Sequence, residues 1–513
     1  MQVKNDVRFG TMAAVALALA VTGCGSTEQV EQVAGDDAEE SVQQAHGWHS
    51  GANASEDDVF RWNTIMLDAN ALDHTPVAPG EDRVFGEQLG PPRTARAFAI
   101  VQIAVFDAFN AIEGGYRSYT GVDEAKRPAS SSAAIVQAAH DTLQALYPSQ
   151  RPRFDTLLAE DLDSIPNTAA KRNGIEVGKR AASAILALRA NDGSQRPDPT
   201  VGVDFFPSNQ PGKWRPDPIS MLTVALGAYY DEVPPFALRY AEQFRIPSPP
   251  SLRSSEYTAA FNEVKRLGGD GITTPTQRTA EQTLVGIYWA YDGTPGLGTP
   301  PRMLNQIAQK IAKQKRSDAL EVARLLALTN VAMADAALAC WTEKFDSQFW
   351  RPITGIREAD PGTGPTGRGD GNPATRGDPT WTPLGAPASN TDGFPNFTPP
   401  FPAYTSGHAS LAGSFFQVLR RFYGTDRIRF TFVSDELNGI TRDNMGNVRP
   451  RVPRTFSTLS QAEEEDGQSR IYLGIHWQFD KREGIRNGRS IGDYVFENTF
   501  RPRRGRDCDH DWH

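Results

Sequence analysis

The chain has 513 residues, of which 39% are hydrophobic and 22% are charged, so it is long enough to bury a large core. Its net charge of −9 arises mainly in residues 25–58, which hold nine Asp or Glu and no Lys or Arg. The remainder is close to neutral, which argues against nucleic acid as a partner because a binding protein would need a basic surface. With three cysteines, the chain is not a disulfide-rich scaffold.

The N-terminal segment has the pattern of an export signal. Lys4 and Arg8 precede an apolar run at 12–21 that is too short to span a membrane but suits a signal-peptide core. It ends in Val21-Thr22-Gly23-Cys24, which resembles the bacterial lipobox, so we predict a lipoprotein signal peptide at 1–23 and lipidation of Cys24. Ordinary secretory cleavage is the alternative. We expect an exported protein that contacts the cell envelope membrane only through this lipid anchor.

Three further regions follow from composition. Residues 24–58 are acidic and rich in Gln, Ala, Ser and Gly, which predicts a disordered tether. A helical domain is expected at 59–500, followed by a C-terminal tail at 501–513. Cys340 and Cys508 are candidates for a disulfide outside the cytoplasm, but two cysteines do not establish one.

Apolar residues recur at helical spacing over much of the domain, and alternating strand patterns are scarce. The segment 93–112 is almost wholly apolar, which indicates a buried central helix. The predicted fold class is therefore all-α, with packed helical bundles in two four-helix-bundle-like units and few or no strands. Helices are expected at 93–112, 131–146, 167–190, 254–267, 279–291, 303–311 and 317–342.

One segment departs from the helical pattern. Residues 360–402 are dense in Gly, Pro, Asp and Thr and are too long for a plain connection. Long loops of this kind often form part of a site, so we expect this one to reach the mouth of the active site. A solvent-exposed insertion is the alternative. A smaller coil at 201–219 is a second candidate for the entrance.

Three motifs carry the chemistry. In the first, Lys344 and Arg351 are seven residues apart, so on one helix both cations would project from the same face. The second, Ser406-Gly407-His408, places a hydroxyl, an approachable backbone and an imidazole side by side. The third runs from Ser469 to Asp480 and includes Arg470, Gly474 and His476 within about three helical turns.

Each motif alone fits an ordinary solvated helix face, turn or core histidine. Together they supply three cations, two histidines, a hydroxyl and a glycine amide, which is the set that a tetrahedral anion such as vanadate or phosphate requires. Asp480, four residues after His476, is a candidate partner for the second nitrogen of that imidazole, although a structural helix-face contact explains it equally well.

With these motifs the chain resembles the vanadium-dependent haloperoxidases, in particular the fungal-type chloroperoxidases, whose superfamily includes type 2 phosphatidic acid phosphatases. The match covers roughly 60–500 and is specific at the motifs, with Thr405 where the family usually has proline. The resemblance implies a vanadate cofactor bonded through His476, the metal ligand, with His408 as the acid–base group. It also implies that the equatorial oxygens are held by Lys344, Arg351, Arg470, Ser406 and Gly407.

The resemblance further implies a halide side to the site. An aspartate is expected to pair with a vanadate-site arginine, which here matches Asp292 with Arg470, and the pair would lower the pKa of the aspartate. Aromatic and proline walls would exclude water from the oxidising centre. Simple core packing is the alternative for these residues. The matching positions are Trp289, Trp341, Pro399, Pro400 and Phe401.

The expected activity is oxidation of chloride or bromide by hydrogen peroxide to hypohalous acid, with a small organic acceptor as a further candidate partner. The second hypothesis is a phosphate monoesterase that uses the same residues, because phosphate fits a vanadate site. A non-catalytic lipid-anchored envelope protein is the third. Halide preference, organic substrate and oligomeric state do not follow from the motifs.

Overall fold

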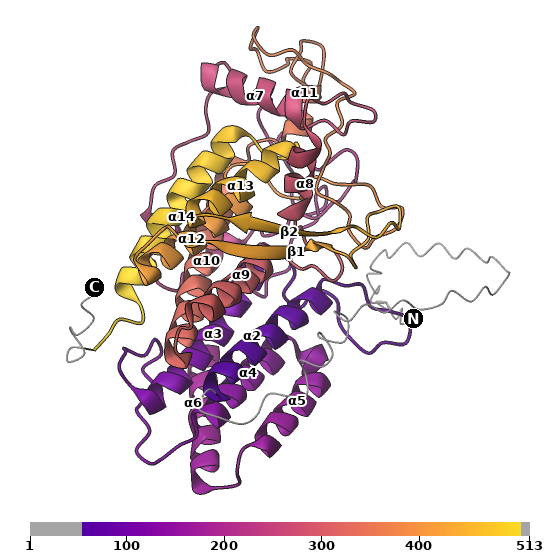
Figure 1. Ribbon diagram of the computed structural model, residues 1–513. Helices are drawn as coiled ribbons and strands as arrows, with labels where there is room; N and C mark the ends of the chain where they lie inside the picture. Colours follow the sequence, from indigo (N-terminus) through magenta and orange to yellow (C-terminus); the bar gives the residue numbers. More distant parts are fainter. Residues whose placement is uncertain (1–53, 504–513) are drawn as a thin grey trace, which may run out of the picture. The chain divides into compact units, whose positions relative to one another are not determined.

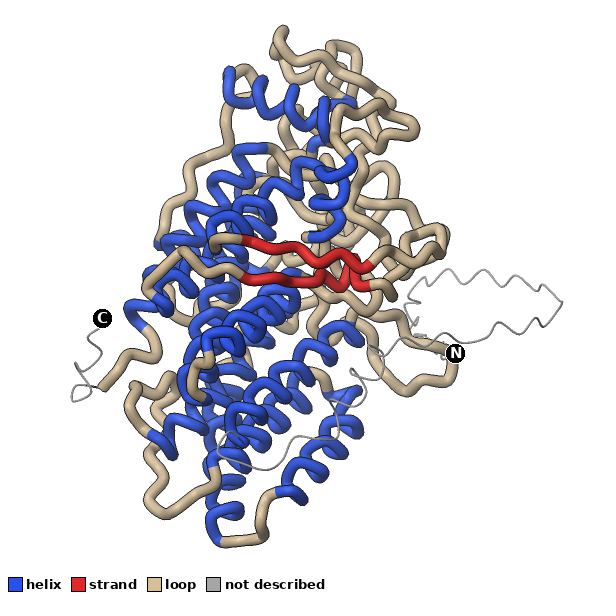
Figure 2. The backbone as a smooth tube through the Cα atoms, in the orientation of Figure 1, coloured by secondary structure: helices blue, strands red, loops and turns tan. Residues whose placement is uncertain are grey.

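α-Helices dominate the regular structure of residues 54–503, the part of the chain that the computed structural model describes (Figures 1 and 2). The α-helices are α2 (Ala54–Asp73), α3 (Pro91–Glu113), α4 (Ser131–Leu146), α5 (Arg151–Ser164), α6 (Ala169–Leu188), α7 (Ser255–Leu267), α8 (Ala280–Tyr288), α9 (Pro300–Lys315), α10 (Ala319–Ser347), α11 (Pro352–Arg357), α12 (Gly407–Tyr423), α13 (Leu459–Tyr472) and α14 (Gln478–Asn498). Short 3₁₀ turns are η1 (Pro148–Gln150), η2 (Tyr230–Glu232) and η3 (Ala241–Gln243).

Two groups of helices share α10. On one side α10 packs against α3, which in turn packs against α4 and α6, with α2 and α5 alongside α4. On the other side α10 packs against α12 and α14, and α13 lies against both of these (Figure 1). Because α10 is covered from both sides, it is apolar almost all round, as is the buried helix α3. The predicted class of packed helical bundles is confirmed.

The only sheet in residues 54–503 is a hairpin of β1 (Phe430–Asn438) and β2 (Arg451–Phe456), which are antiparallel and pair Phe430 with Phe456. It crosses the helices in Figure 2 and contacts α8 and α9 through β1. The sequence prediction located no strand here. The reason is that Ser434, Asp435 and Glu436 form a continuous polar run inside β1, so a clean alternation of apolar and polar residues is absent.

Several predicted boundaries were wrong. Residues 54–58, assigned to the tether, form the first turns of α2. The helix expected at 279–291 ends at Tyr288, and the one expected at 303–311 spans Pro300–Lys315 because two prolines at its first positions suit a helix start. The predicted signal peptide, Cys24, most of the tether and Cys508 lie outside the described residues. Cys340 is buried on α10, with its thiol donating to the Thr405 carbonyl at 3.5 Å.

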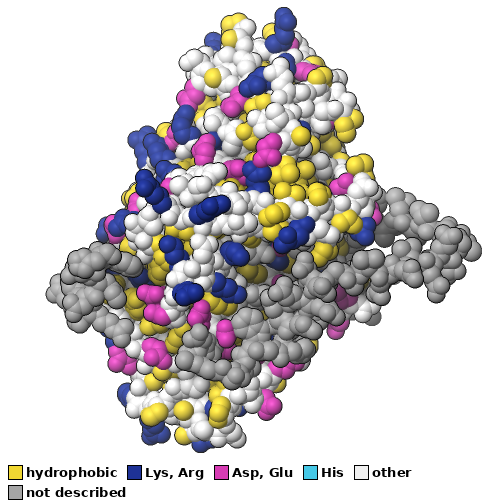
Figure 3. Space-filling model, in the orientation of Figure 1, with side chains coloured by type: hydrophobic (Ala, Val, Ile, Leu, Met, Phe, Trp, Pro, Cys, Tyr) yellow, Lys and Arg dark blue, Asp and Glu magenta, His cyan; other side chains and the backbone are white. Residues whose placement is uncertain are grey.

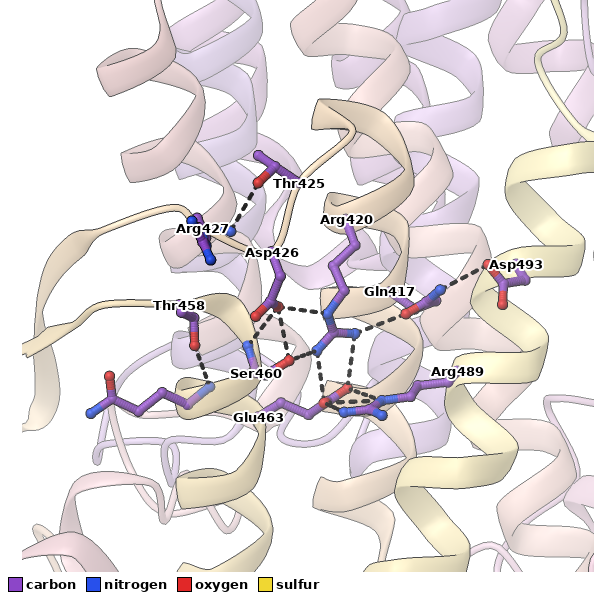
Figure 4. Close-up of polar contacts among 11 residues, drawn as sticks. Gln417, Arg420, Thr425, Asp426, Arg427, Thr458, Ser460, Glu463, Arg489 and Asp493 are labelled. Carbon is purple, nitrogen blue, oxygen red and sulfur yellow. Dashed lines mark hydrogen bonds and ion pairs between the residues drawn. The ribbon is translucent and has the colours of Figure 1, made fainter.

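An ion network centred on the buried Glu463 ties α13 to both α12 and α14 (Figure 4). Glu463 on α13 is fully buried and accepts hydrogen bonds from Arg420 of α12, at 2.7 and 3.3 Å, and from Arg489 of α14. Asp426 accepts from Arg420 and from Ser460 at 2.8 Å each. A buried carboxylate is stable only when it is paired in this way, so the network sets the position of α13 and of Arg470 near its end.

Helices α12 and α14 approach each other at backbone distance. A Cβ atom on Gly488 of α14 would lie 2.3 Å from the Ser410 carbonyl oxygen, and one on Gly413 of α12 would lie 2.7 Å from the Ile485 carbonyl oxygen. Glycine is therefore required at both positions. The close approach brings the first turn of α12 against the first turn of α14, where the Ser406 amide donates to the Asp480 carbonyl at 3.1 Å.

Candidate active site

The three sequence motifs meet where helices end. Lys344 lies in the last turn of α10, Ser406 is the N-cap of α12, and His476 lies in the turn between α13 and α14. The second and third motifs contribute residues to the wall of a cavity of about 260 Å³. Its wall includes Gly407, His408, Arg470, His476 and Asp292, whereas Lys344, Arg351 and Ser406 lie outside that wall.

Lys344 and Arg351 do not share a helix face, contrary to the prediction. Gln348, with φ 48°, ends α10, and Arg351 is the N-cap of α11, so the chain turns between the two cations. Both nevertheless face the segment 401–405. The Lys344 ammonium donates to the Pro402 and Ala403 carbonyls at 2.9 and 3.0 Å and to the Thr405 carbonyl. Its three hydrogens are thereby all engaged.

Arg351 connects the first motif to the third. Its Nε donates to the Phe401 carbonyl, and its Nη1 donates to the Ile475 carbonyl, both at 2.9 Å. Nη1 also lies 2.8 Å from Nε2 of His476. A guanidinium can only donate, so Nε2 of His476 carries a lone pair. Burial, with the nearby Arg351, Lys344 and Arg470, holds the pKa of His476 well below its usual value, and the ring is neutral.

Asp480 fixes the other side of this imidazole. His476 Nδ1 donates to Asp480 Oδ2 at 2.8 Å, and the same oxygen accepts from the Trp477 amide at 3.0 Å. The predicted pairing is therefore present, although His476 precedes α14 and does not share a helix face with Asp480, which caps the first turn. Burial raises the pKa of Asp480 to about 7. The hydrogen bond orients the ring and leaves the Nε2 lone pair on the site side.

Arg470 pairs with Asp292 as the sequence implied, through Nη2 and Oδ1 at 2.6 Å. The expected direction of the Asp292 pKa was wrong. The Asp292 side chain is only 5% exposed, and burial raises its pKa because the desolvation of the carboxylate outweighs the attraction of Arg470. The pair fixes the direction of the guanidinium in space.

His408 lies in the first turn of α12 with its Nε2 2.6 Å from the Ala290 carbonyl oxygen. A carbonyl can only accept, so Nε2 carries the proton. Burial, with Arg470 nearby, keeps the pKa of His408 well below its usual value and the ring neutral. Nδ1 is then the nitrogen with a lone pair. The preceding Ser406 hydroxyl accepts from the Ala409 amide at 3.4 Å and caps α12.

The donors present suit an anion. Within residues 54–503, three buried guanidinium nitrogens have no hydrogen-bond partner: Nη2 of Arg351, and Nε and Nη1 of Arg470. Leaving such groups unpaired is costly, and an oxyanion would satisfy them. Burial lowers the pKa of Lys344 to about 7 and of Arg351 to about 9, which a bound anion would oppose. The same residues hold no cluster of three His, Cys, Asp or Glu suited to a metal cation.

The cavity wall next to these donors is aromatic. The rings of Trp341 and Phe401 are 4.9 Å apart, and Pro399 and Pro400 continue the wall. The ring of Phe401 lies about 5 Å from both the Lys344 ammonium and the Arg351 guanidinium. Cation–π attraction helps to hold these buried charges in place.

Trp289 does not belong to that wall, which corrects the expectation from the sequence. Its indole packs against Tyr288 of α8 and against Phe456 of the hairpin, and its Nε1 donates to the Glu465 carboxylate at 3.0 Å. Helix α8 ends at Tyr288, and the turn that follows directs Asp292 toward Arg470 while Trp289 faces the core.

Some of the wall was missed by sequence reasoning. His74 and the segments 85–91 and 222–226 line the cavity far from any motif. Residues 85–90 and 222–226 are not helical. Their apolar residues therefore show no helical periodicity that would have identified them as part of a buried wall. Short apolar stretches inside coil, such as Leu222, Val224 and Leu226, were the available signal.

Comparisons with known proteins agree with this geometry. Residues 324–505 match a family model that is described as the VCPO second helical-bundle domain. A vanadium chloroperoxidase from Curvularia inaequalis is 32% identical over 512 residues, covering 82% of this chain and 78% of that protein.

Solved structures share the fold. A bacterial vanadium-dependent iodoperoxidase superposes with a TM-score of 0.68 at 23% identity, over 88% of this chain and 99% of that one. An apo-type bacterial vanadium-dependent chloroperoxidase gives 0.60 at 17% identity, over 80% and 94%. With the relative at 32% identity over most of both chains, these findings show that the chain belongs to the vanadium chloroperoxidase family of the vanadium haloperoxidases.

Proposed function

We propose that the protein is a vanadate-dependent haloperoxidase that oxidises chloride or bromide with hydrogen peroxide to hypohalous acid. The observation that carries the proposal is the arrangement around His476. The Nε2 lone pair of the neutral imidazole accepts from Arg351 Nη1 in this structure, and it lies beside buried N–H groups of Arg351 and Arg470 that lack partners within residues 54–503. Family membership supports the same activity.

The roles of the anion-binding residues follow from these contacts. His476 Nε2 would bind the vanadium, and the free N–H groups of Arg351 and Arg470 would hold oxygens, with the Gly407 amide at the start of α12 adding a helix N-terminus. Ser406 would contribute its hydroxyl. Lys344 would act mainly through its charge, because its hydrogens are engaged by carbonyls. Bound vanadate supplies a Lewis acid that activates peroxide without changing oxidation state.

His408 would move the proton. Its Nε2–H is anchored to the Ala290 carbonyl, which leaves Nδ1 as the atom that accepts a proton from hydrogen peroxide and later returns it. Asp292 touches neither halide nor peroxide in this scheme. It positions Arg470 through the 2.6 Å hydrogen bond.

The halide would approach along Trp341, Phe401, Pro399 and Pro400. Chloride and bromide are less strongly hydrated than carboxylate or phosphate, and an apolar wall beside buried cations favours such an anion while excluding water. Vanadate can be replaced by phosphate in a site of this composition, so a phosphate monoesterase is the competing activity.

One assay separates the two activities. Protein lacking residues 1–24, loaded with vanadate, is tested for bromination and chlorination of monochlorodimedone and, without vanadate, for hydrolysis of a phosphate monoester. We expect halogenation and no hydrolysis above background. Hydrolysis without halogenation would contradict the proposal. His476→Ala is the control variant, and it should abolish whichever activity belongs to this site.

We also propose that the protein is exported and anchored to the cell envelope through lipid on Cys24. The support is the charged, apolar and small-residue pattern of residues 1–24. Mass spectrometry of the N-terminal peptide tests this in membranes of a bacterial host. Wild type should carry acyl chains and Cys24→Ser should not, and an unmodified or uncleaved wild-type N-terminus would refute lipidation.

A further inference from the structure

The turn after α8 carries two groups of the candidate active site. The Ala290 carbonyl accepts from Nε2 of His408 at 2.6 Å, and two residues later the Asp292 carboxylate accepts from Arg470 at 2.6 Å. Between them Tyr291 has a φ of 44°, a backbone conformation that residues other than glycine rarely adopt. Such a conformation persists only where the surrounding contacts impose it. Whatever holds this turn therefore acts on both His408 and Arg470.

The contacts that hold the turn come from an irregular stretch of β1. Between the pairs Val433–Pro453 and Asn438–Arg451, the hairpin has four residues on β1, 434–437, and one residue on β2. An excess of this kind is a β-bulge, which redirects side chains out of the regular ladder and is frequent next to active sites. The bulge contains the polar run that interrupts the apolar pattern of β1.

Three consecutive residues of the bulge contact α8 and the turn. The Ser434 hydroxyl donates to the carbonyl of Tyr288, the last residue of α8, at 2.6 Å. Tyr291 is held at two points, because its amide donates to Glu436 Oε1 at 3.2 Å and its hydroxyl accepts from the Asp435 amide at 2.7 Å. Tyr291 and Glu436 are both 0% exposed, so water does not compete for these contacts.

Glu436 also connects the turn to the long loop at 360–402. Its Oε2 accepts from the Ser389 hydroxyl at 2.6 Å and from Arg449 Nη1 at 2.5 Å. Arg449 Nη1 donates to the Ser389 hydroxyl as well, at 2.7 Å. Both oxygens of this buried carboxylate are therefore engaged, and moving it would leave buried donors without a partner. The network fixes Glu436 and, with it, the Tyr291 amide.

We infer that Glu436 is a positioning residue for two groups of the active site, a role that rests on the proposed haloperoxidase function. It acts through the Tyr291 peptide. One route runs through the preceding carbonyl to His408, which moves the proton in the proposed reaction. The other runs through the following carboxylate to Arg470, which holds an oxygen of the anion. Glu436 itself does not line the cavity.

Glu436→Gln tests this role with little change in side-chain size. An amide has one oxygen where the carboxylate has two, so it cannot accept from both Arg449 and the Tyr291 amide. The charged guanidinium keeps the oxygen, and the new NH₂ group then faces the N–H of Tyr291. We expect a folded protein whose vanadate affinity and whose kcat at saturating vanadate each fall about tenfold.

Two measurements on the full chain check this. Equilibrium dialysis gives the vanadate affinity, and bromination of monochlorodimedone at saturating vanadate gives kcat. A folded Glu436→Gln variant that keeps both wild-type values would overturn the inference.

Asp161→Asn is the matched control. Asp161 is 3% exposed and also accepts through both oxygens, from Arg61 Nε at 2.9 Å and from Trp62 Nε1 at 2.8 Å, but it lies on α5, outside the cavity wall. This variant should lose stability while its vanadate affinity and kcat stay within about twofold of wild type. Losses equal to those of Glu436→Gln would overturn the inference, because any buried carboxylate would then have the same effect.

A double-mutant cycle with Asp292→Ala separates the two routes. If Glu436 acts on Arg470 through Asp292, its effect on vanadate affinity should shrink to less than about twofold once Asp292 is replaced. The fall in kcat should persist, because His408 is reached through the Ala290 carbonyl instead. Affinity losses that add in full would overturn the route through Asp292.

Tyr291→Phe tests the same turn without touching Glu436, and it decides the question if Glu436→Gln does not fold. The substitution removes only the hydroxyl that accepts from the Asp435 amide, so affinity and kcat should both fall several-fold. Tyr230→Phe is its control, since the Tyr230 hydroxyl donates to the Pro92 carbonyl at 2.7 Å and does not contact the turn. Equal effects of the two phenylalanine variants would contradict the assignment.

Vanadate binding keeps this inference distinct from the proposed function. It requires no turnover, and vanadate would also occupy the site of a phosphate monoesterase. Failure of the wild type to oxidise bromide would contradict the haloperoxidase function alone. Wild-type vanadate affinity in both Glu436→Gln and Tyr291→Phe would overturn the positioning role of Glu436, whichever reaction the site performs.

Discussion

Asp480 Oδ2 accepts two hydrogen bonds at once, from Nδ1 of His476 at 2.8 Å and from the Trp477 amide at 3.0 Å. One carboxylate oxygen therefore both caps α14 and orients the imidazole whose other nitrogen contacts Arg351. Local helix formation and the geometry of the anion site are coupled through this atom.

We predict that Asp480→Ala weakens vanadate binding about 10- to 100-fold, as is typical when the hydrogen-bond partner of a metal-binding histidine is lost. Equilibrium dialysis of vanadate measures the effect. Loss of the cap should also lower stability by about 1 kcal/mol. Asp493→Ala, on the exposed side of α14 near Arg421, is the control, and equal weakening by both variants would contradict the role of Asp480.

Asp292→Asn should weaken vanadate binding about tenfold while the fold persists. The amide can still accept from Arg470, but it no longer carries the charge that holds this buried guanidinium in place. Vanadate titration followed by bromination kinetics measures both affinity and turnover. An unchanged affinity would show that Arg470 is positioned by α13 alone.

His408→Ala should lower the turnover number for halogenation by a factor of about 10² to 10⁴, the usual contribution of a general acid–base group. Vanadate affinity should change much less, because the anchoring Nε2 belongs to His476. Parallel measurements of kcat and of vanadate binding check this. A large loss of binding with normal turnover at saturating vanadate would reverse the roles of the two histidines.

Gly488→Ala should destabilise the protein by about 1–3 kcal/mol, the usual cost of overpacking. The new methyl group would lie 2.3 Å from the Ser410 carbonyl oxygen, so α12 and α14 would have to separate. Urea unfolding measures the change. Ser490→Ala, two residues along the same helix, removes only a local hydrogen bond to the Arg486 carbonyl and should have a much smaller effect.

His140 should make stability depend on pH. Its nitrogens lie 2.8 Å from Asp141 and from Asp155, and these two carboxylates raise its pKa although burial opposes them. A raised pKa in the folded protein adds stability below the unfolded value of about 6.5, and this is lost as pH rises through the folded value.

The contribution should be less than about 1 kcal/mol, since Asp155 is largely exposed. Thermal unfolding from pH 5 to 9 tests the prediction. His140→Gln should flatten the component of the profile that disappears as pH rises, relative to wild type. An identical profile in the variant would show that His140 contributes nothing in this range.

The distribution of charged side chains on the surface agrees with the composition of the sequence. On the face shown in Figure 3, basic and acidic side chains are interspersed over the described part of the chain. This agrees with a near-neutral domain whose negative charge is concentrated in residues 25–58.

The sequence by itself determined the helical class and predicted the residues of the candidate anion site. Residue type and motif spacing predicted five of its residues, because an oxyanion requires cationic and imidazole groups, which are recognisable in a sequence. These residues are Lys344, Arg351, His408, Arg470 and His476. Helical periodicity likewise marked α3, α4 and α10, since these helices each bury a long apolar surface.

Tertiary structure decided how those groups are used. Only the folded chain shows that α10 ends before Arg351, that Trp289 faces the core, and that burial raises the pKa of Asp292 despite Arg470. The parts of the cavity wall formed by residues 85–91 and 222–226 also appear only there. The physical reason is that helix ends, desolvation and cavities depend on contacts between residues more than a hundred positions apart, which no local pattern encodes.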